Sequence, residues 1–408
     1  MEQIIFYLII VIIVFNYFFE RILSYLNINN MKAQLPKEAE DIYDENKYRK
    51  SQEYNKESSK FSIISSTLGF ILILGMLFFE GFAYVDVLAR SISENPIIIA
   101  LLFFGILAIA SDIIFTPFDI YDTFVIEEKY GFNKTTTKTY IMDKIKGYLL
   151  GAIVGGGLIA LITWFYYSTG IYFWVYTWVA LIIFMVLSSM FYASLIIPLF
   201  NKLTPLPEGE LRSAIESYCK KTDFKLDDLF VMDSSKRSSK GNAFFSGFGS
   251  HKKIVLFDTL IEKHTVEELV AVLAHEVGHY KKKHTLQGMF LGIIQSGFML
   301  FILSWFIDSP ALAGALSVQE PSFHIGVLVF SLLYTPLSIV LGIMMNANSR
   351  KNEFEADKYA KETYNESALI SALKKLSSDN LSNLTPHPAY IFVYYSHPPL
   401  LERINALR

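Results

Sequence analysis

The chain has 408 residues, with 36 Lys and Arg against 39 Asp and Glu, and a formal net charge of −3. This balance leaves no overall positive charge of the kind that attracts nucleic acid, so no nucleic-acid partner is expected. The single cysteine, Cys219, excludes an internal disulfide and any cysteine-based zinc site.

Apolar residues are concentrated in long runs. Hydrophobic residues make up 52% of the chain and charged residues 18%, and a helix needs roughly 20 mostly apolar residues to cross a bilayer. The first run, IIFYLIIVIIVF, lacks a basic n-region and a cleavage site, so it is expected to be a retained helix rather than a signal peptide. Seven membrane spans are predicted, at residues 4–19, 62–84, 97–116, 148–167, 171–197, 286–307 and 324–346.

Basic residues alternate between the loops that join these spans. The segments after spans one, three, five and seven hold 35 of the 36 Lys and Arg residues, and Arg90 is the one exception. Cytoplasmic loops carry the excess of basic residues in membrane proteins. The alternation therefore supports seven spans, with the N-terminus outside or lumenal and the C-terminus in the cytosol.

The spans divide the chain into four regions. Residues 1–197 hold the first five spans with their cytosolic connectors, and residues 286–346 hold the last two. Residues 198–285 are long enough for a small folded cytosolic unit, and residues 347–408 form a second cytosolic segment. Any chemistry in these two segments would lie on the same side of the membrane.

The first cytosolic unit contains a metal-binding pattern. After the strand-like run IVLF (254–257), Thr265 and Glu268 form a capping box that predicts the start of a helix. On this helix the motif HEVGH places His275 and His279 one turn apart on the same face, where both can bind one zinc ion. Glu276 can then act as a general base toward a water molecule at the metal.

A catalytic zinc site usually has three protein ligands and one open position. The best candidate for the third ligand is Glu353 in the run NANSRKNEFEAD, where the seventh span is expected to continue into the cytosol as a helix. Asp357 follows at i+4, so one carboxylate can bind metal while the other orients a ligand histidine. Glu355 is expected on another, solvated face. His284 is expected on a different face of the HEVGH helix, as an interfacial residue.

Three motifs together resemble the CAAX prenyl protease type 1 family of seven-span membrane zinc metalloproteases: HEVGH, SRKNEFEAD and SHPPLLERI (396–404). Similar stretches at 124–136, 198–211 and 238–249 extend the resemblance over nearly the whole chain. The resemblance implies one zinc per chain, with His275, His279 and Glu353 as its ligands and Glu276 as the base.

The resemblance also implies roles for residues outside the metal motif. Asn242 and the neighbouring Ala243 would hold the substrate backbone, and His397 would stabilise the oxyanion of the tetrahedral intermediate. Arg403 would pair with Asp357 and brace the site.

The fold class implied is an all-α integral membrane protein. Its seven transmembrane helices would form a tilted-helix barrel around a water-filled chamber, closed by a small cytosolic α+β metalloprotease domain. The expected activity is zinc-dependent peptide hydrolysis. Its substrate would be a prenylated C-terminal CAAX sequence that loses its last three residues.

Two alternatives stay open at the level of sequence. The residue usage favours a prokaryotic member, which would cleave membrane or misfolded proteins in the inner membrane, whereas a eukaryotic member would act in the endoplasmic reticulum membrane. A different class of function is a zinc-binding membrane transporter or scaffold without proteolytic turnover. A structural zinc, however, usually has four protein ligands and does not need Glu276.

Overall fold

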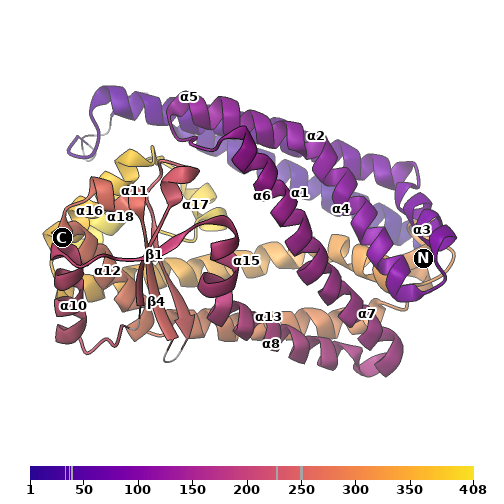
Figure 1. The fold of residues 1–408 in the computed structure, drawn as a ribbon. Coiled ribbons are helices and arrows are strands. Elements are labelled where there is room, and N and C mark those ends of the chain that lie inside the picture. The colour runs from indigo at the N-terminus through magenta and orange to yellow at the C-terminus, as the bar shows by residue number, and fades with distance from the viewer. Residues whose placement is uncertain (33, 36, 38–39, 227, 249–250) are drawn as a thin grey trace.

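Long apolar helices, several of them tilted relative to one another, make up most of the molecule (Figure 1). The structure is a computed structural model that describes the chain except residues 33, 36, 38–39, 227 and 249–250. The long helices are α1 Glu2–Asn30, α2 Glu45–Phe78, α4 Pro96–Tyr121, α6 Thr137–Leu150, α7 Gly156–Thr169, α8 Phe173–Phe191, α13 His284–Phe306 and α15 Phe323–Thr363.

Six continuous helical stretches in the described chain are long and apolar enough to cross a membrane. One of them, residues 137–200, joins α6 to α7 through the π-helix η3 Gly151–Gly155 and then reverses at η4 Gly170–Tyr172. Gly170 has φ 55°, a conformation that glycine adopts readily. Because α7 and α8 pack against each other after this turn, the stretch contains two of the predicted spans. All seven predicted spans therefore correspond to long helices.

The predicted second span ends too late. Helix α2 ends at Phe78, and a separate helix, α3 Gly81–Ile92, begins after Glu80, which has φ 55°. A glutamate in the left-handed region is uncommon. Gly81 follows it directly and opens α3, where a Cβ atom would lie 2.5 Å from Met76 Sδ.

The outer surface of α1 shows why these helices suit lipid. Its strongly exposed apolar side chains recur every three or four residues and include Ile4, Val11, Phe15, Phe18 and Ile22. This spacing places them along one helical stripe. In a membrane protein such a stripe faces acyl chains rather than water.

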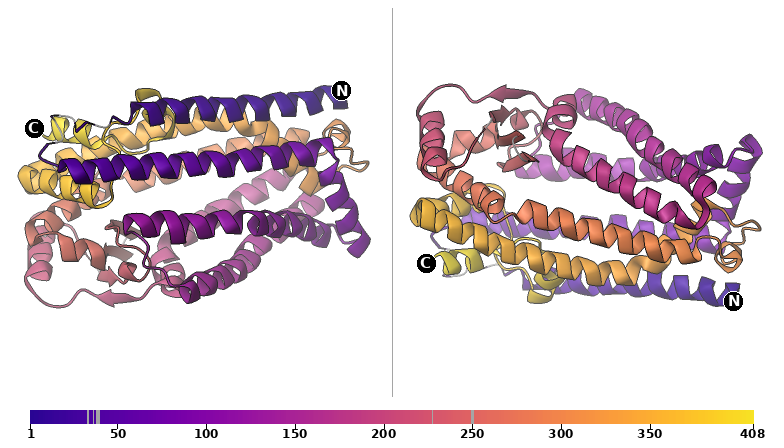
Figure 2. Two further views of the ribbon diagram at one scale, coloured as in Figure 1. Left: turned by 90° about the horizontal axis from the view of Figure 1, so that it is seen from above. Right: turned by 90° about the horizontal axis from the view of Figure 1, so that it is seen from below.

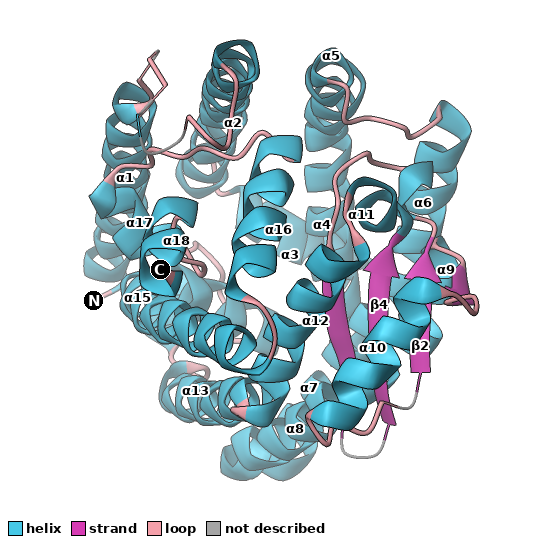
Figure 3. Ribbon diagram, turned by 90° about the vertical axis from the view of Figure 1, so that its left-hand side faces the viewer, coloured by secondary structure: helices cyan, strands magenta, loops and turns pink. Residues whose placement is uncertain are grey.

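The long helices pack as neighbours in a closed ring. Contacts link α1 to α2, α4 to α7, α7 to α8, α8 to α13, α13 to α15, and α15 back to α1, while α3 and η2 Asp122–Glu127 join α2 to α4. Figure 3 shows this ring end-on. Two apolar clusters hold these helices together. One joins α1, α4 and α15 and includes Ile9, Phe103 and Ile325. The other joins α8 and α13 and includes Phe173 and Leu300.

A small α/β unit lies at the opposite end of the ring from the N-terminus (Figures 1 and 2). Its sheet has the order β1-β2-β4-β3, in which β2 and β4 are parallel and the outer pairs are antiparallel. The strands are β1 Leu203–Pro205, β2 Asp228–Met232, β3 Ala243–Phe248 and β4 His251–Phe257. The expected strand at 254–257 is therefore confirmed as the end of β4.

Helices cover this sheet and connect it to the membrane segment. The helices next to the sheet are α10 Glu210–Lys221, α11 Asp258–Lys263 and α12 Val266–Lys281. Three further helices, α16 Glu366–Asp379, α17 Pro388–Tyr394 and α18 Leu400–Leu407, pack against α15. The shorter elements are α5 Glu128–Tyr130, η5 Tyr192–Ile196, α9 Ile197–Phe200, η6 Ser234–Lys236 and α14 Pro310–Gly314. Helix α15 continues far beyond the predicted span and packs against α12. The membrane segment and the α/β unit thus share one continuous helix.

Candidate active site

Helix α12 begins at the predicted capping box. The Thr265 hydroxyl accepts from the Glu268 backbone N–H at 3.3 Å, and Glu268 Oε2 accepts from the Thr265 backbone N–H at 2.9 Å. Glu268 also accepts from Lys375 and Ser371 of α16. The start of the HEVGH helix is therefore fixed by its own sequence and by a neighbouring helix.

A glycine allows α12 to approach α15 closely. A Cβ atom at Gly278 would lie 3.0 Å from the carbonyl oxygen and 3.1 Å from the Cα atom of Ala356. Ala356 is fully buried on α15, three residues beyond Glu353. The glycine of HEVGH thus lets the two helices meet near the point where their polar side chains converge.

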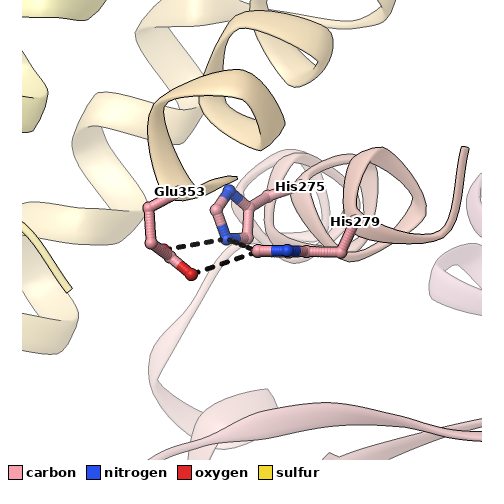
Figure 4. Close-up of side chains that lie close together, drawn as sticks. All are labelled: His275, His279 and Glu353. Carbon is pink, nitrogen blue, oxygen red and sulfur yellow. Dashed lines mark hydrogen bonds and ion pairs between the residues drawn. The ribbon is translucent and has the colours of Figure 1, made fainter. Parts of the chain in front are cut away.

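His275, His279 and Glu353 converge in this region (Figure 4). The two Nε2 atoms lie 3.1 Å apart. The Glu353 carboxylate lies 3.4 Å from His275 Nε2 and 3.2 Å from His279 Nε2. In the part of the chain that the structure describes, these three side chains are close enough together to hold one metal ion, and no other group of three His, Cys, Asp or Glu side chains is.

The donor set fits zinc. Nitrogen and oxygen atoms bound to one tetrahedral zinc lie about 3.3 Å from one another, which the observed separations match. Glu353 is 4% exposed, and its Oε2 atom makes no hydrogen bond, although it lies 3.3 Å from Arg403 Nη1 and 3.4 Å from His275 Nε2. A buried carboxylate needs positive charge beside it, and a metal ion held with the two histidines would add to the charge of Arg403. Two histidines and one glutamate leave a coordination position open, as a catalytic site requires.

Asp357 and Arg403 hold the outer side of His275. Asp357 Oδ1 lies 2.8 Å from His275 Nδ1, and Arg403 donates to both Asp357 oxygens at 2.6 and 2.8 Å. Arg403 Nη1 also lies 3.3 Å from Glu353. The predicted pairing of Arg403 with Asp357 is present, and the arginine contacts the third member of the metal-binding group as well.

The same contacts affect the protonation of His275. Burial lowers the pKa of the imidazole, but hydrogen bonds with Asp357 and Glu353 outweigh burial and raise this pKa to about 9. In the metal-free protein at neutral pH a proton therefore sits where a metal would bind. The protonated ring faces Asp357 with its Nδ1–H and Glu353 with its Nε2–H, so each carboxylate has its own N–H group.

Glu276 faces the cavity beside the three converging side chains. Burial raises the pKa of its carboxyl group, while His275 and His279 oppose this effect. The cavity has a volume of about 610 Å³ and is lined by Glu276, by the three metal-binding side chains, and by Asn242, Ala243, His397 and Arg403 among others. The cavity thus brings every predicted site residue except Asp357 to one surface.

His397 and Asn242 approach this cavity from different segments. His397 precedes α18, its side chain is 65% exposed, and its Nε2 atom lies 3.4 Å from Glu353. Asn242 precedes β3, one of the two edge strands of the described sheet, and its Oδ1 atom accepts from the Ala243 backbone N–H at 2.8 Å. Both side chains are therefore accessible to a molecule in the cavity.

The expectation that His284 lies on another face of the HEVGH helix is wrong. Helix α12 ends at Lys281, Lys283 adopts φ 62°, and His284 starts a new helix, α13. The turn directs His284 back toward α12, where it is buried and its Nδ1 atom lies 3.0 Å from His279 Nδ1. Three consecutive lysines give no sign of a helix break, so the sequence could not reveal this contact.

Comparisons with known proteins agree with this arrangement. Residues 24–202 match the family described as CAAX prenyl protease N-terminal, five membrane helices, and residues 205–408 match peptidase family M48. The chain is 38% identical over 382 residues to the probable CAAX prenyl protease 1 of Schizosaccharomyces pombe, covering 89% of this chain and 80% of that protein.

Two further relatives extend over nearly the full length. CAAX prenyl protease 1 of Saccharomyces cerevisiae is 33% identical over 417 residues, covering 95% of this chain and 92% of that protein. The crystal structure of S. mikatae Ste24p superimposes with a TM-score of 0.94 at 32% identity and covers 99% of both chains. These relatives do not favour a transporter or scaffold. The chain therefore belongs to peptidase family M48 and is a multi-pass membrane metalloprotease of this zinc-dependent family.

Proposed function

We propose that this protease removes the C-terminal tripeptide from prenylated CAAX substrates. The observation that carries the proposal is the end-to-end match to relatives named CAAX prenyl protease, combined with the convergence of His275, His279 and Glu353 on one cavity. Relatives that cover both the membrane helices and the catalytic segment support a shared substrate class more strongly than the metal motif alone. Cleavage of membrane or misfolded proteins without a prenyl group is the competing substrate class.

In this proposal His275, His279 and Glu353 bind one zinc ion per chain. Zinc held by these residues would supply Lewis-acid chemistry, which would polarise the scissile carbonyl and make a water at the open position more acidic. Glu276 takes a proton from the attacking water and delivers it to the leaving amine. Its partial burial and its place beside both histidines support this role.

The residues around the metal group have distinct tasks. Asp357 accepts from His275 Nδ1–H and so presents Nε2 toward the metal, and Arg403 fixes Asp357. His397, exposed in the cavity next to Glu353, donates a hydrogen bond to the developing oxyanion.

The substrate backbone lies along β3 in this proposal. An edge strand presents unpaired backbone groups to which an extended peptide can add as another strand. Asn242 and Ala243 are at the start of this edge and line the cavity. They would hold the peptide while Glu276 and His397 act on the scissile bond.

The site would face the cytosol. The basic-residue alternation supports an N-terminus that is outside or lumenal and a cytosolic C-terminus. The membrane would be the endoplasmic reticulum in a eukaryotic cell and the inner membrane in a prokaryotic one. Residues 198–285 and 347–408 would form the catalytic unit, and 1–197 with 286–346 the membrane unit.

The test compares two peptides with the same CAAX sequence, one farnesylated and one unmodified, with and without a zinc chelator. We expect release of the last three residues from the farnesylated peptide, a much lower kcat/KM for the unmodified peptide, and loss of both activities with chelator. Equal cleavage of the two peptides would contradict the proposed substrate class. Cleavage that persists after verified removal of zinc would contradict the proposed metal site.

A further inference from the structure

His279 has a second contact that the mechanism above does not use. Its Nε2 atom faces His275 and Glu353, while its Nδ1 atom lies 3.0 Å from His284 Nδ1. On the far side of that ring, His284 Nε2 lies 3.3 Å from Glu355 Oε2. A chain of hydrogen bonds thus runs from the metal-binding group through two imidazoles to a carboxylate.

The order of protons along this chain follows from the chemistry of imidazole. A neutral histidine that binds metal through Nε2 carries its proton on Nδ1. His279 therefore donates to His284 Nδ1, which must be unprotonated. His284 consequently carries its own proton on Nε2 and donates it to the Glu355 carboxylate. Every nitrogen and oxygen in the chain then has one consistent role.

We propose that His284 and Glu355 are positioning residues that fix the orientation and tautomer of His279. This inference rests on the proposed function, because it assumes that His279 Nε2 binds zinc. It gives each metal-binding histidine its own support. Asp357 with Arg403 supports His275 directly, whereas Glu355 supports His279 through His284.

Burial makes the contact with His284 significant. His284 is 7% exposed, so replacing its ring with an apolar group would leave the His279 Nδ1–H without an acceptor in a partly buried place. Loss of a residue that orients a metal-bound histidine typically costs about 10-fold to 100-fold in metal affinity or activity. The Glu355 side chain is 41% exposed and also lies 3.7 Å from Lys351, so its contribution should be smaller.

The experiment measures zinc affinity independently of catalysis. The full-length protein in detergent is stripped of zinc and titrated with Zn²⁺ against a competing chelating dye. We expect His284→Leu to weaken zinc binding about 10-fold to 100-fold. His284→Asn should recover much of the loss, because its side-chain oxygen can take the place of Nδ1 as an acceptor. Glu355→Leu should weaken binding severalfold.

The matched control is His264→Leu. His264 is equally buried, at 8% exposed, and its Nδ1 atom contacts the Leu260 carbonyl oxygen rather than the metal-binding group. It should therefore leave zinc affinity unchanged. Comparison with this control separates loss of a specific hydrogen bond from loss of a buried ring.

The outcomes distinguish this inference from the proposed function. Wild-type zinc affinity in His284→Leu, or equal affinities of His284→Asn and His284→Leu, would overturn the positioning role while the metal site stands. A wild-type protein that binds no zinc would overturn the metal site itself. If His284→Leu does not fold, Glu355→Leu decides, and unchanged zinc affinity in this variant would overturn the proposal.

Discussion

The close contact between α12 and α15 makes Gly278→Ala a sensitive test of how the site is assembled. The added Cβ atom would lie 3.0 Å from the Ala356 carbonyl oxygen, whereas ordinary contact begins near 3.4 Å. The obstacle is backbone, which cannot rotate away as a side chain can. The two helices must therefore separate locally by about 0.4 Å.

This displacement is large relative to what the site tolerates. Catalytic groups must be held within about 0.5 Å of their productive positions. Since a misplacement of about 1 Å can cost roughly 100-fold in rate, a shift of this size should lower kcat/KM about fivefold to tenfold. Overpacking of a tight interface should also destabilise the fold by about 1–3 kcal/mol.

The assay combines peptide cleavage with zinc titration of the purified protein, using Gly342→Ala as the control. Gly342 also lies on α15, but a Cβ atom there meets nothing within 4 Å. We expect weaker zinc binding and slower cleavage for Gly278→Ala, and wild-type values for the control. Wild-type zinc affinity and kcat/KM in Gly278→Ala would refute the argument that this contact sets the position of Glu353 relative to the two histidines.

Three further predictions concern protons and the oxyanion. Zinc binding to the stripped protein should strengthen about tenfold per pH unit as the pH rises toward 9, because the His275 proton must leave before zinc can bind. Calorimetry in buffers of different ionisation enthalpy should detect about one released proton. A zinc affinity that does not change with pH would contradict this prediction. Since burial raises the pKa of Glu276, kcat/KM should fall on the acid side at a pH above the ordinary carboxyl value of 4.5; a pH profile with no such limb above 4.5 would argue against this base. His397→Ala should lower kcat about 100-fold to 1000-fold and leave zinc content unchanged, and an unaltered kcat would remove His397 from the mechanism.

The sequence predicts the long apolar helices well because hydropathy acts over long segments. Each predicted span overlaps a long helix, although the second runs past the end of α2, and the capping box at Thr265 starts α12 as expected. The convergence of His275, His279 and Glu353 could also be anticipated. The i, i+4 spacing fixes the histidines on one face, and Glu353 lies in the run expected to continue the seventh span, a choice with which the family resemblance agrees.

Contacts that depend on a single backbone torsion could not be predicted. The breaks at Glu80 and Lys283 place non-glycine residues in the left-handed region, where neither residue type signals a turn. The second break decides the position of His284, which sequence spacing alone assigned to the wrong helix. The approach of Gly278 to Ala356 likewise depends on how two distant helices pack.

The measurement that tests the central claim most directly is zinc content together with turnover in Glu276→Gln. The substitution preserves the size of the side chain and leaves His275, His279 and Glu353 in place, but it removes the group that accepts the proton. The account predicts one zinc per chain, as in the wild type, and no detectable cleavage of the farnesylated CAAX peptide. Cleavage at a rate near that of the wild type, in a preparation free of other proteases, would contradict it.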